Sequence, residues 1–180
     1  SLYEKPIGIE LSNRFFEEEW QRVIQPNSIQ DVNAYKTVSR IGRGTRLDRR
    51  QRLAIWPVFD AYRKQLDMNG QKELDDCYRS VREHLANNQI TLPYSAIVVD
   101  EAQDMGTQAF LLLREMVKEN ANDLFIVGDA HQRIYGRNKV VLGQCGINIR
   151  GRAKKLHIIE PQMKHEDGLA SYWQVAPLMI

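Results

Sequence analysis

The sequence predicts an α/β protein in which a helical part, residues 1–90, precedes part of a parallel sheet, residues 91–159. Apolar residues recur at helical spacing through the first ninety residues. After Pro93 the pattern changes to two short apolar runs, 96–99 and 124–127, on either side of an amphipathic helix over 108–119. Short loops between alternating elements favour a right-handed parallel strand–helix–strand unit. With 180 residues, 43% of them apolar, the chain can bury one ordinary core.

The helical part is predicted to contain three main helices. The first ends at Pro26, and its apolar side consists of Phe15, Phe16, Trp20, Val23 and Ile24. Ser28 with Asp31 supplies a capping start for a short helix that follows. A long helix over 48–67 contains Pro57, which is expected to kink or interrupt it, and its apolar side consists of Leu53, Trp56, Phe59, Tyr62 and Leu66. A helix over 73–87 carries the apolar stripe Leu74, Cys77, Tyr78, Val81 and Leu85. We expect the aromatic side chains of these helices to form core, not a ligand site.

Polar side chains follow both predicted strands. Residues 97–104 read IVVDEAQD, residues 125–135 read FIVGDAHQRIY, and a third strand is predicted over 156–159. Because parallel strands present the residues that follow them at the carboxyl edge of the sheet, the two polar segments are expected to lie there together. One acidic pair after an apolar run is weak evidence, whereas two such segments at this spacing form a specific combination.

The net charge of +2 conceals two basic blocks. Residues 36–52 contain seven Lys and Arg and one acid, Asp48, and residues 131–156 contain seven Lys and Arg and no acid. This distribution suggests a polyanion as partner, and two solvated faces are the alternative. Cys77 and Cys145 lack metal-type spacing, which favours a reduced, cytoplasmic protein. No apolar run approaches the roughly 20 residues that span a bilayer, so no membrane partner is expected.

Together, the two polar segments resemble motifs II and III of the UvrD/Rep group of superfamily 1 DNA helicases, and the resemblance covers roughly residues 12–157. It implies part of a RecA-like P-loop NTPase sheet with an inserted helical subdomain. It also implies ATP hydrolysis coupled to translocation on single-stranded DNA, with Mg²⁺ and ATP as cofactors of the intact family and DNA as a sequence-independent partner.

In the first segment, the resemblance implies that Asp100 holds Mg²⁺ through its waters and that Glu101 orients or deprotonates the attacking water. Gln103 matches a glutamine that helps to link the nucleotide site to DNA. Asp104 is expected to have a structural role at the start of the next helix.

In the second segment, the resemblance implies that Gly128 lets the backbone turn and that Asp129 supports the loop beside the nucleotide. Gln132 matches a glutamine that senses the terminal phosphate. Tyr135 matches an aromatic residue beside the DNA path, and an ordinary core or surface tyrosine is the alternative. Arg137, in the second basic block, is assigned to DNA binding, and His131 is assigned no role.

A basic loop with the sequence IGRGTRL, residues 41–47, leads into the long helix and resembles a stretch found in a bacterial subgroup of these helicases. The candidate contacts to the DNA backbone here are Arg43, Arg46, Arg49 and Arg50, and a solvated loop is the alternative. The acidic segment ELDD, residues 73–76, resembles a motif that places a helix near the DNA channel.

No G-x-x-x-x-G-K-[ST] segment occurs among the 180 residues. Because that phosphate-binding loop precedes both motifs in the family, we expect the chain to begin after it and to bind no nucleotide tightly alone. The leading hypothesis is therefore a fragment of an ATP-dependent DNA helicase motor, inactive by itself, with self-association through the truncated face as a further expectation. The alternatives are a non-enzymatic DNA-binding module and a regulatory partner of an intact helicase or nuclease.

The resemblance stops after His157. Relatives continue into an Asn-Tyr-Arg-Thr-Thr segment, whereas this chain reads IIEPQMKHEDG over 158–168. Permissible codons for those residues, read in another frame, yield Tyr-Arg-Thr-Thr-Asp-Glu-Thr-Arg-Arg-Trp, which continues the family pattern. We hypothesise that the reading frame shifts near Ile158, so that residues 160–180 form a non-family tail never selected to pack on this domain. Sequencing the coding DNA tests this hypothesis, and codons that cannot yield Tyr-Arg-Thr-Thr in another frame would contradict it.

Overall fold

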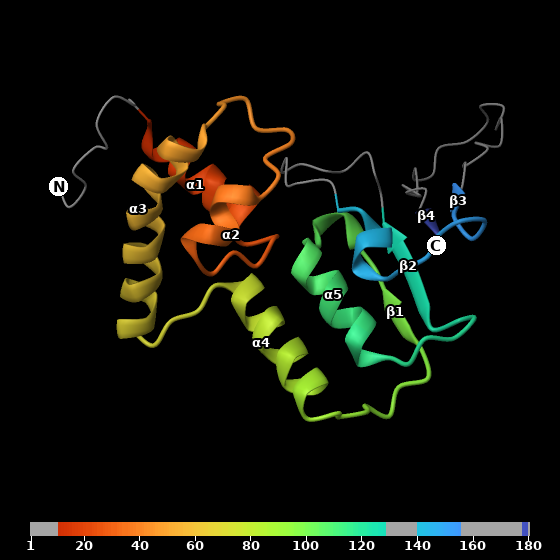
Figure 1. Ribbon diagram of the computed structural model, residues 1–180. Coiled ribbons are helices and arrows are strands. Elements are labelled where there is room, and N and C mark those ends of the chain that lie inside the picture. The colour runs from red at the N-terminus through yellow and green to blue at the C-terminus, as the bar shows by residue number, and fades with distance from the viewer. Residues whose placement is uncertain (1–10, 129–139, 156–177, 180) are drawn as a thin grey trace, which may run out of the picture.

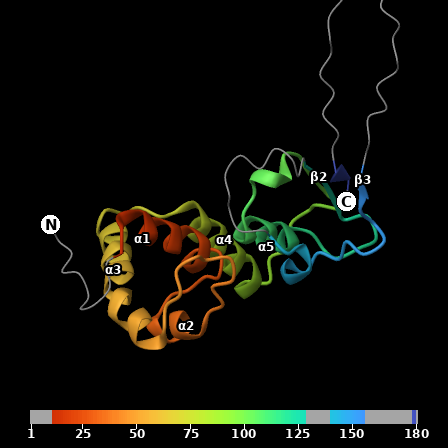
Figure 2. The same cartoon turned by 90° about the horizontal axis from the view of Figure 1, so that it is seen from above.

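The computed structural model describes residues 11–128, 140–155 and 178–179. These residues form a helical part and a sheet part that lie side by side (Figures 1 and 2). No helix in the described residues has the length and apolar character needed to cross a membrane.

The helical part consists of α1 (Asn13–Glu19), a π-helical turn η1 (Trp20–Ile24), α2 (Val32–Thr37) and α3 (Arg49–Met68). Asp31 caps α2, and its side chain accepts hydrogen bonds from the backbone N–H groups of residues 33 and 34. Ser28 has a left-handed backbone, with φ of 53°, and plays no part in this cap, so the predicted pair reduces to Asp31. A capping box of Asp48 with Gln51 starts α3. The helix then continues through Pro57, so of the predicted kink or interruption there the interruption is excluded.

The core of the helical part is a cluster of aromatic and aliphatic side chains between α1, η1, α2 and α3. Phe59 is 3% exposed, and its ring lies 5.7–6.3 Å from four other aromatic rings, those of Phe16, Trp20, Tyr35 and Trp56. Leu53 was predicted to join this core but is 42% exposed. It lies two residues before Ile55, about half a turn away around the helix axis, and Ile55 and Phe59 define the buried face.

Helix α4 (Leu74–Asn87) links the helical part to the sheet part and packs against α5 (Thr107–Met116). Its predicted apolar stripe is only half covered, because Leu85 is buried while Leu74 is 61% and Val81 is 49% exposed. The stripe is therefore a core face at one end only.

Buried polar contacts fasten the two parts together at α4 and α5. The Asp76 carboxylate accepts a hydrogen bond from the Gln25 amide at 3.0 Å and pairs with Arg79 at 2.7 Å. The Gln108 amide, 1% exposed, donates to the carbonyl of Pro26 at 2.8 Å. Breaking a buried hydrogen bond leaves a desolvated polar group without a partner, so these contacts define how the parts sit together. The acidic segment 73–76 thus places α4.

The sheet part begins with β1 (Ile97–Val99) and β2 (Leu124–Gly128), which pair in parallel with Ile97 opposite Leu124. Helix α5 connects them, so the predicted strand–helix–strand unit is confirmed. Two short strands extend the sheet in the order β1-β2-β4-β3, where β3 is Lys154–Lys155 and β4 is Leu178–Met179. β4 pairs antiparallel with both β2 and β3. The predicted strand at 156–159 and the other tail residues, 160–177 and 180, lie outside the described residues.

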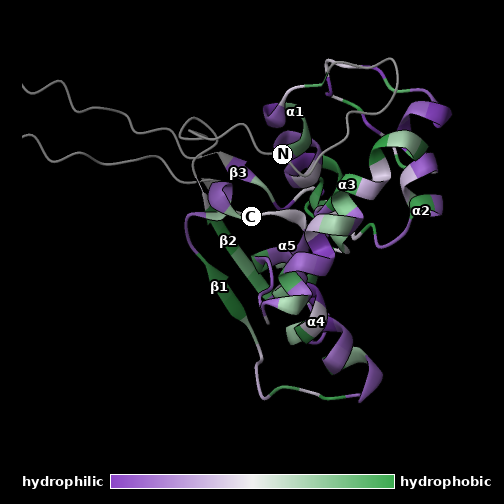
Figure 3. Cartoon of the chain, turned by 90° about the vertical axis from the view of Figure 1, so that its left-hand side faces the viewer, coloured by the Kyte–Doolittle hydropathy of each residue, from purple (hydrophilic) through white to green (hydrophobic). Residues whose placement is uncertain are grey.

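The β1–β2 pair is covered on one face. Val99 and Ile126 pack beneath α5, in a cluster with Phe110, Cys145 and Ile147. On the other face Val98 is 73% and Phe125 is 39% exposed, and Figure 3 shows no helix of the described chain there. Strand β1 was predicted to be buried, but a parallel sheet needs helices on both faces for that.

Candidate functional site

The segment that follows β1 lies against Gly128, at the carboxyl end of β2, while the polar residues predicted to follow Gly128 lie outside the described residues. A Cβ atom on Gly128, the last residue of β2, would lie 2.7 Å from Oε1 of Gln103 and 3.1 Å from the backbone nitrogens of Ala102 and Gln103. The Gln103 side chain could shift, but the two backbone nitrogens leave little room for a Cβ atom, so glycine favours the close approach of the turn to the end of β2. Gly128 does not have a positive φ, so this close approach, and not the turn first expected, favours glycine.

Glu101 adopts an uncommon backbone conformation at this edge. Its φ of 51° and ψ of 37° lie in the left-handed region, which disfavours residues other than glycine by about 1–2 kcal/mol. The Asp100 carboxylate accepts a hydrogen bond from the Glu101 N–H at 2.8 Å and so supports this conformation. The Gln103 amide donates to Oε2 of Glu101 at 2.5 Å. Asp100 thus holds the backbone of Glu101, and Gln103 holds its carboxylate.

The acidic side chains of this edge face solvent. Asp100, Glu101 and Asp104 are exposed, while Gln103 is half-buried. The 3₁₀ turn η2 (Ala102–Asp104) carries Gln103 toward Gly128 and leads into α5. Among the described residues, no group of three or more His, Cys, Asp or Glu could hold a metal by protein ligands alone. Carboxylates at this edge suit an ion that takes its remaining ligands from water and phosphate.

Four predicted site residues, Asp129, Gln132, Tyr135 and Arg137, lie in the segment 129–139, outside the described residues. A pocket lined by Arg114, Asp123 and Ile147 lies at the amino end of β2. This pocket is at the opposite end of the strand from Gly128 and belongs to a different surface.

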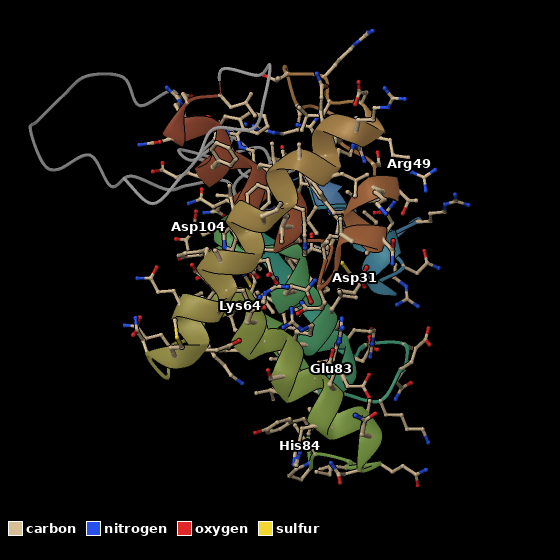
Figure 4. All side chains as sticks on the ribbon, turned by 60° about the vertical axis from the view of Figure 1, so that its left-hand side comes forward. Asp31, Arg49, Lys64, Glu83, His84 and Asp104 are labelled. Atoms are coloured by element: carbon tan, nitrogen blue, oxygen red, sulfur yellow. The ribbon has the colours of Figure 1, made fainter. Side chains whose placement is uncertain are left out.

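The predicted basic loop separates into two groups of arginines. Arg46, Arg49 and Arg50 are exposed, and Figure 4 shows Arg49 extending outward from the start of α3. Arg43 instead has a side chain that is 6% exposed, pairing with Glu18 at 2.6 Å and with Glu19 at 3.0 Å. Its guanidinium is therefore engaged within the fold, and its contact to the DNA backbone stays a prediction.

Glu19 is the centre of a buried charge cluster that charge counting along the sequence did not reveal. Its carboxylate is fully buried and accepts bonds from Arg40 at 2.5 and 2.8 Å, from the Tyr35 hydroxyl at 2.8 Å and from Arg43. Both guanidiniums also lie over the ring of Phe15. A signal was present: Glu19 falls midway between Phe15 and Val23 at helical spacing, on the apolar side of the first helix.

The charge cluster holds its carboxylates ionised. Burial by itself raises the pKa of Glu19, but the hydrogen bonds from Arg40 and Tyr35 and the charge of Arg40 together outweigh burial and lower it. The hydrogen bonds from Arg43 and Arg14 lower the pKa of Glu18 to about 2. Burial and the neighbouring Glu19 carboxylate raise the pKa of the Tyr35 hydroxyl. At neutral pH both carboxylates are therefore ionised, while the Tyr35 hydroxyl keeps its proton.

Comparison with known proteins identifies one family. The family model described as UvrD/REP helicase N-terminal domain matches residues 9–140, a range that includes α1 to β2. No curated protein and no solved structure matches the chain significantly.

Proposed function

The chain belongs to the UvrD/REP helicase family through its N-terminal domain, and from this premise we propose that it is part of the motor of an ATP-dependent DNA helicase. In the intact motor, a RecA-like P-loop NTPase sheet binds the nucleotide, and ATP hydrolysis drives translocation on single-stranded DNA. The present chain supplies one portion of that sheet together with a helical subdomain. By itself it does not complete the catalytic cycle.

The observation that carries the proposal is the contact between Gly128 and Gln103. It brings the turn after β1 directly against the carboxyl end of β2, which offers a route for coupling between the two motifs. A motor needs such coupling, because events at the nucleotide must change the grip on DNA. Gln103 also holds the Glu101 carboxylate through its amide, which gives it a positioning role beside the proposed catalytic base.

Asp100 and Glu101 fit the chemistry of a magnesium nucleotide. Mg²⁺ usually binds through one or two carboxylates together with phosphate oxygens and water, and Asp100 offers a solvent-facing carboxylate. When bound, Mg²⁺ would neutralise charge that develops on the phosphates. Glu101 would orient the attacking water, with Gln103 fixing its carboxylate. We assign Gln132 and Asp129 to this proposed site, and Tyr135 and Arg137 to the proposed DNA path. We further propose that the protein is cytoplasmic, with its cysteines reduced.

We expect the isolated chain to release no phosphate from ATP above background. The 180 residues contain no G-x-x-x-x-G-K-[ST] loop, so Asp100 and Glu101 act without a phosphate cradle. The measurement is phosphate release with Mg²⁺ and single-stranded DNA for the parent, Glu101→Gln and a control, Glu115→Gln, which alters an exposed acid on α5. DNA-stimulated turnover that is lost in Glu101→Gln but kept in Glu115→Gln would contradict the prediction.

The genomic DNA before the codon for Ser1 decides between the motor and its alternative. An in-frame phosphate-binding loop there supports a piece of a helicase motor. A promoter and start codon directly before Ser1 would instead indicate a non-enzymatic DNA-binding module derived from a helicase.

A further inference from the structure

The turn at residues 40–43 presents an apolar side chain to solvent. Its backbone closes through a hydrogen bond from the Arg43 N–H to the Arg40 carbonyl at 3.1 Å. Gly42 has a φ of 85°, which the third position of such a turn requires. Ile41 occupies the second position and is 93% exposed. Single exposed apolar residues are common on protein surfaces, so the surroundings of Ile41 must decide whether it has a role.

The turn is held rigidly from beneath. Both flanking arginines, Arg40 and Arg43, point inward and are 6% exposed in their side chains, bonded to Glu19. The Arg40 guanidinium also donates to the carbonyl of Thr45 at 2.8 Å, which brings the following residues beside the turn. Leu47, 8% exposed, anchors the far end in the core. Because these inward contacts fix the backbone, ordering the turn against a ligand loses little conformational entropy.

Exposed cations follow the turn, one in the loop and two in the first turn of α3. Arg46, Arg49 and Arg50 are exposed, and none of the ion pairs among the described residues involves them. The nearby acid, Asp48, uses its carboxylate to cap α3. The segment 40–50 thus carries an exposed apolar side chain and three exposed cations outside the ion pairs, which matches a ligand that combines phosphates with accessible apolar faces. A single nucleic-acid strand has both, whereas a duplex keeps its base faces stacked inside.

Resting on the proposed function, we infer that residues 40–50 form a preformed contact for single-stranded DNA, which we call the 40–50 platform. Arg46, Arg49 and Arg50 neutralise phosphates, and Ile41 packs against an unstacked base or its sugar. Glu18 and Glu19 do not contact DNA in this proposal. They are positioning residues, because they bind Arg40 and Arg43 and so fix the turn.

The test measures binding of the full chain to a fluorescent 20-nucleotide thymidine strand and to a 20-base-pair duplex over a salt series. Changing Arg46, Arg49 and Arg50 to Gln should reduce the slope of log affinity against log salt on the single strand by about 2, from three lost phosphate contacts. The control changes the exposed residues Lys64, Lys72 and Lys118 to Gln, which removes the same net charge outside residues 40–50. This variant should keep most of the parent's dependence of affinity on salt.

Ile41→Ser should weaken single-strand binding about fivefold and leave duplex binding unchanged, because only the single strand offers apolar faces. Met68→Ser, which alters an 80% exposed residue at the far end of α3, is its control. If the parent binds DNA and both the Ile41 and the triple-arginine variants bind it equally well, the 40–50 platform is overturned. The proposed function would remain intact. Equal loss on single strand and duplex would overturn the single-strand preference. Absence of parent binding to either DNA would overturn the DNA partner itself.

Discussion

Glu19→Gln should lower the free energy of unfolding by about 3–5 kcal/mol, the range observed when one member of a buried ion pair is removed. The substitution keeps the shape of the side chain but removes the charge that neutralises Arg40 and Arg43, whose side chains are 6% exposed. The two guanidiniums would then be buried without a counter-charge. Urea unfolding followed by circular dichroism measures the effect.

Glu17→Gln is the matched control, because Glu17 is exposed on the same helix and should change stability by less than about 0.5 kcal/mol. Equal stability of the two variants would show that the cluster does not hold the fold. The neighbouring apolar core would then have to account for the position of residues 40–47.

The same cluster predicts how acid affects the protein. The folded-state pKa of Glu19 lies below its usual value of 4.5, so its contribution to stability is complete above about pH 4.5 and declines as the pH falls through the folded pKa. The Glu18 carboxylate, with a pKa of about 2, follows the same direction. The difference in stability between the parent and Glu19→Gln should therefore shrink below pH 4.5 and remain constant from pH 5 to 8. A difference that grows on acidification would contradict an ionised Glu19.

Phe59→Ala should cost about 3–5 kcal/mol, because it removes the ring at the centre of the aromatic cluster and leaves a cavity between α1, η1, α2 and α3. Four other rings lose a contact at 5.7–6.3 Å. Thermal or urea unfolding of the variant measures this loss.

Leu53→Ala, on the same helix, is the control and should cost less than about 1 kcal/mol, since Leu53 is already 42% exposed. The sequence pattern placed both residues on one apolar side. Similar losses in the two variants would therefore support the pattern over the structure.

The sheet and its polar edge could be predicted from sequence because they depend on local and periodic information. The apolar runs of β1 and β2 are short, a helix lies between them, and parallel pairing then brings the residues that follow β1 beside the end of β2. The contact between Gly128 and Gln103 follows from that geometry. The left-handed conformation of Glu101 could not be predicted, because no sequence rule places a glutamate there.

The fate of the arginines could not be predicted for a different reason. A charge in a sequence has no visible partner, and Glu19 lies twenty-one residues before Arg40 and twenty-four before Arg43. Only the tertiary fold brings them together. It divides the basic block into arginines that pair with buried carboxylates, Arg40 and Arg43, and arginines that are exposed, Arg46, Arg49 and Arg50. Counting charges identified the basic region but could not show that Arg43 pairs with Glu18 and Glu19 within the fold.

The uncovered face of β1 and β2 has a consequence for how this polypeptide behaves in concentrated solution. Val98 and Phe125 expose apolar surface on this face. Among the described strands, β1 is at the edge of the sheet and pairs on one side only. An unpaired strand edge next to such a surface is a template for further strands, which natural proteins normally shield. Purified alone, the chain should thus be limited by colloidal stability before it is limited by unfolding. Dilution and a solubilising fusion partner would matter more to its handling than added stabilising mutations.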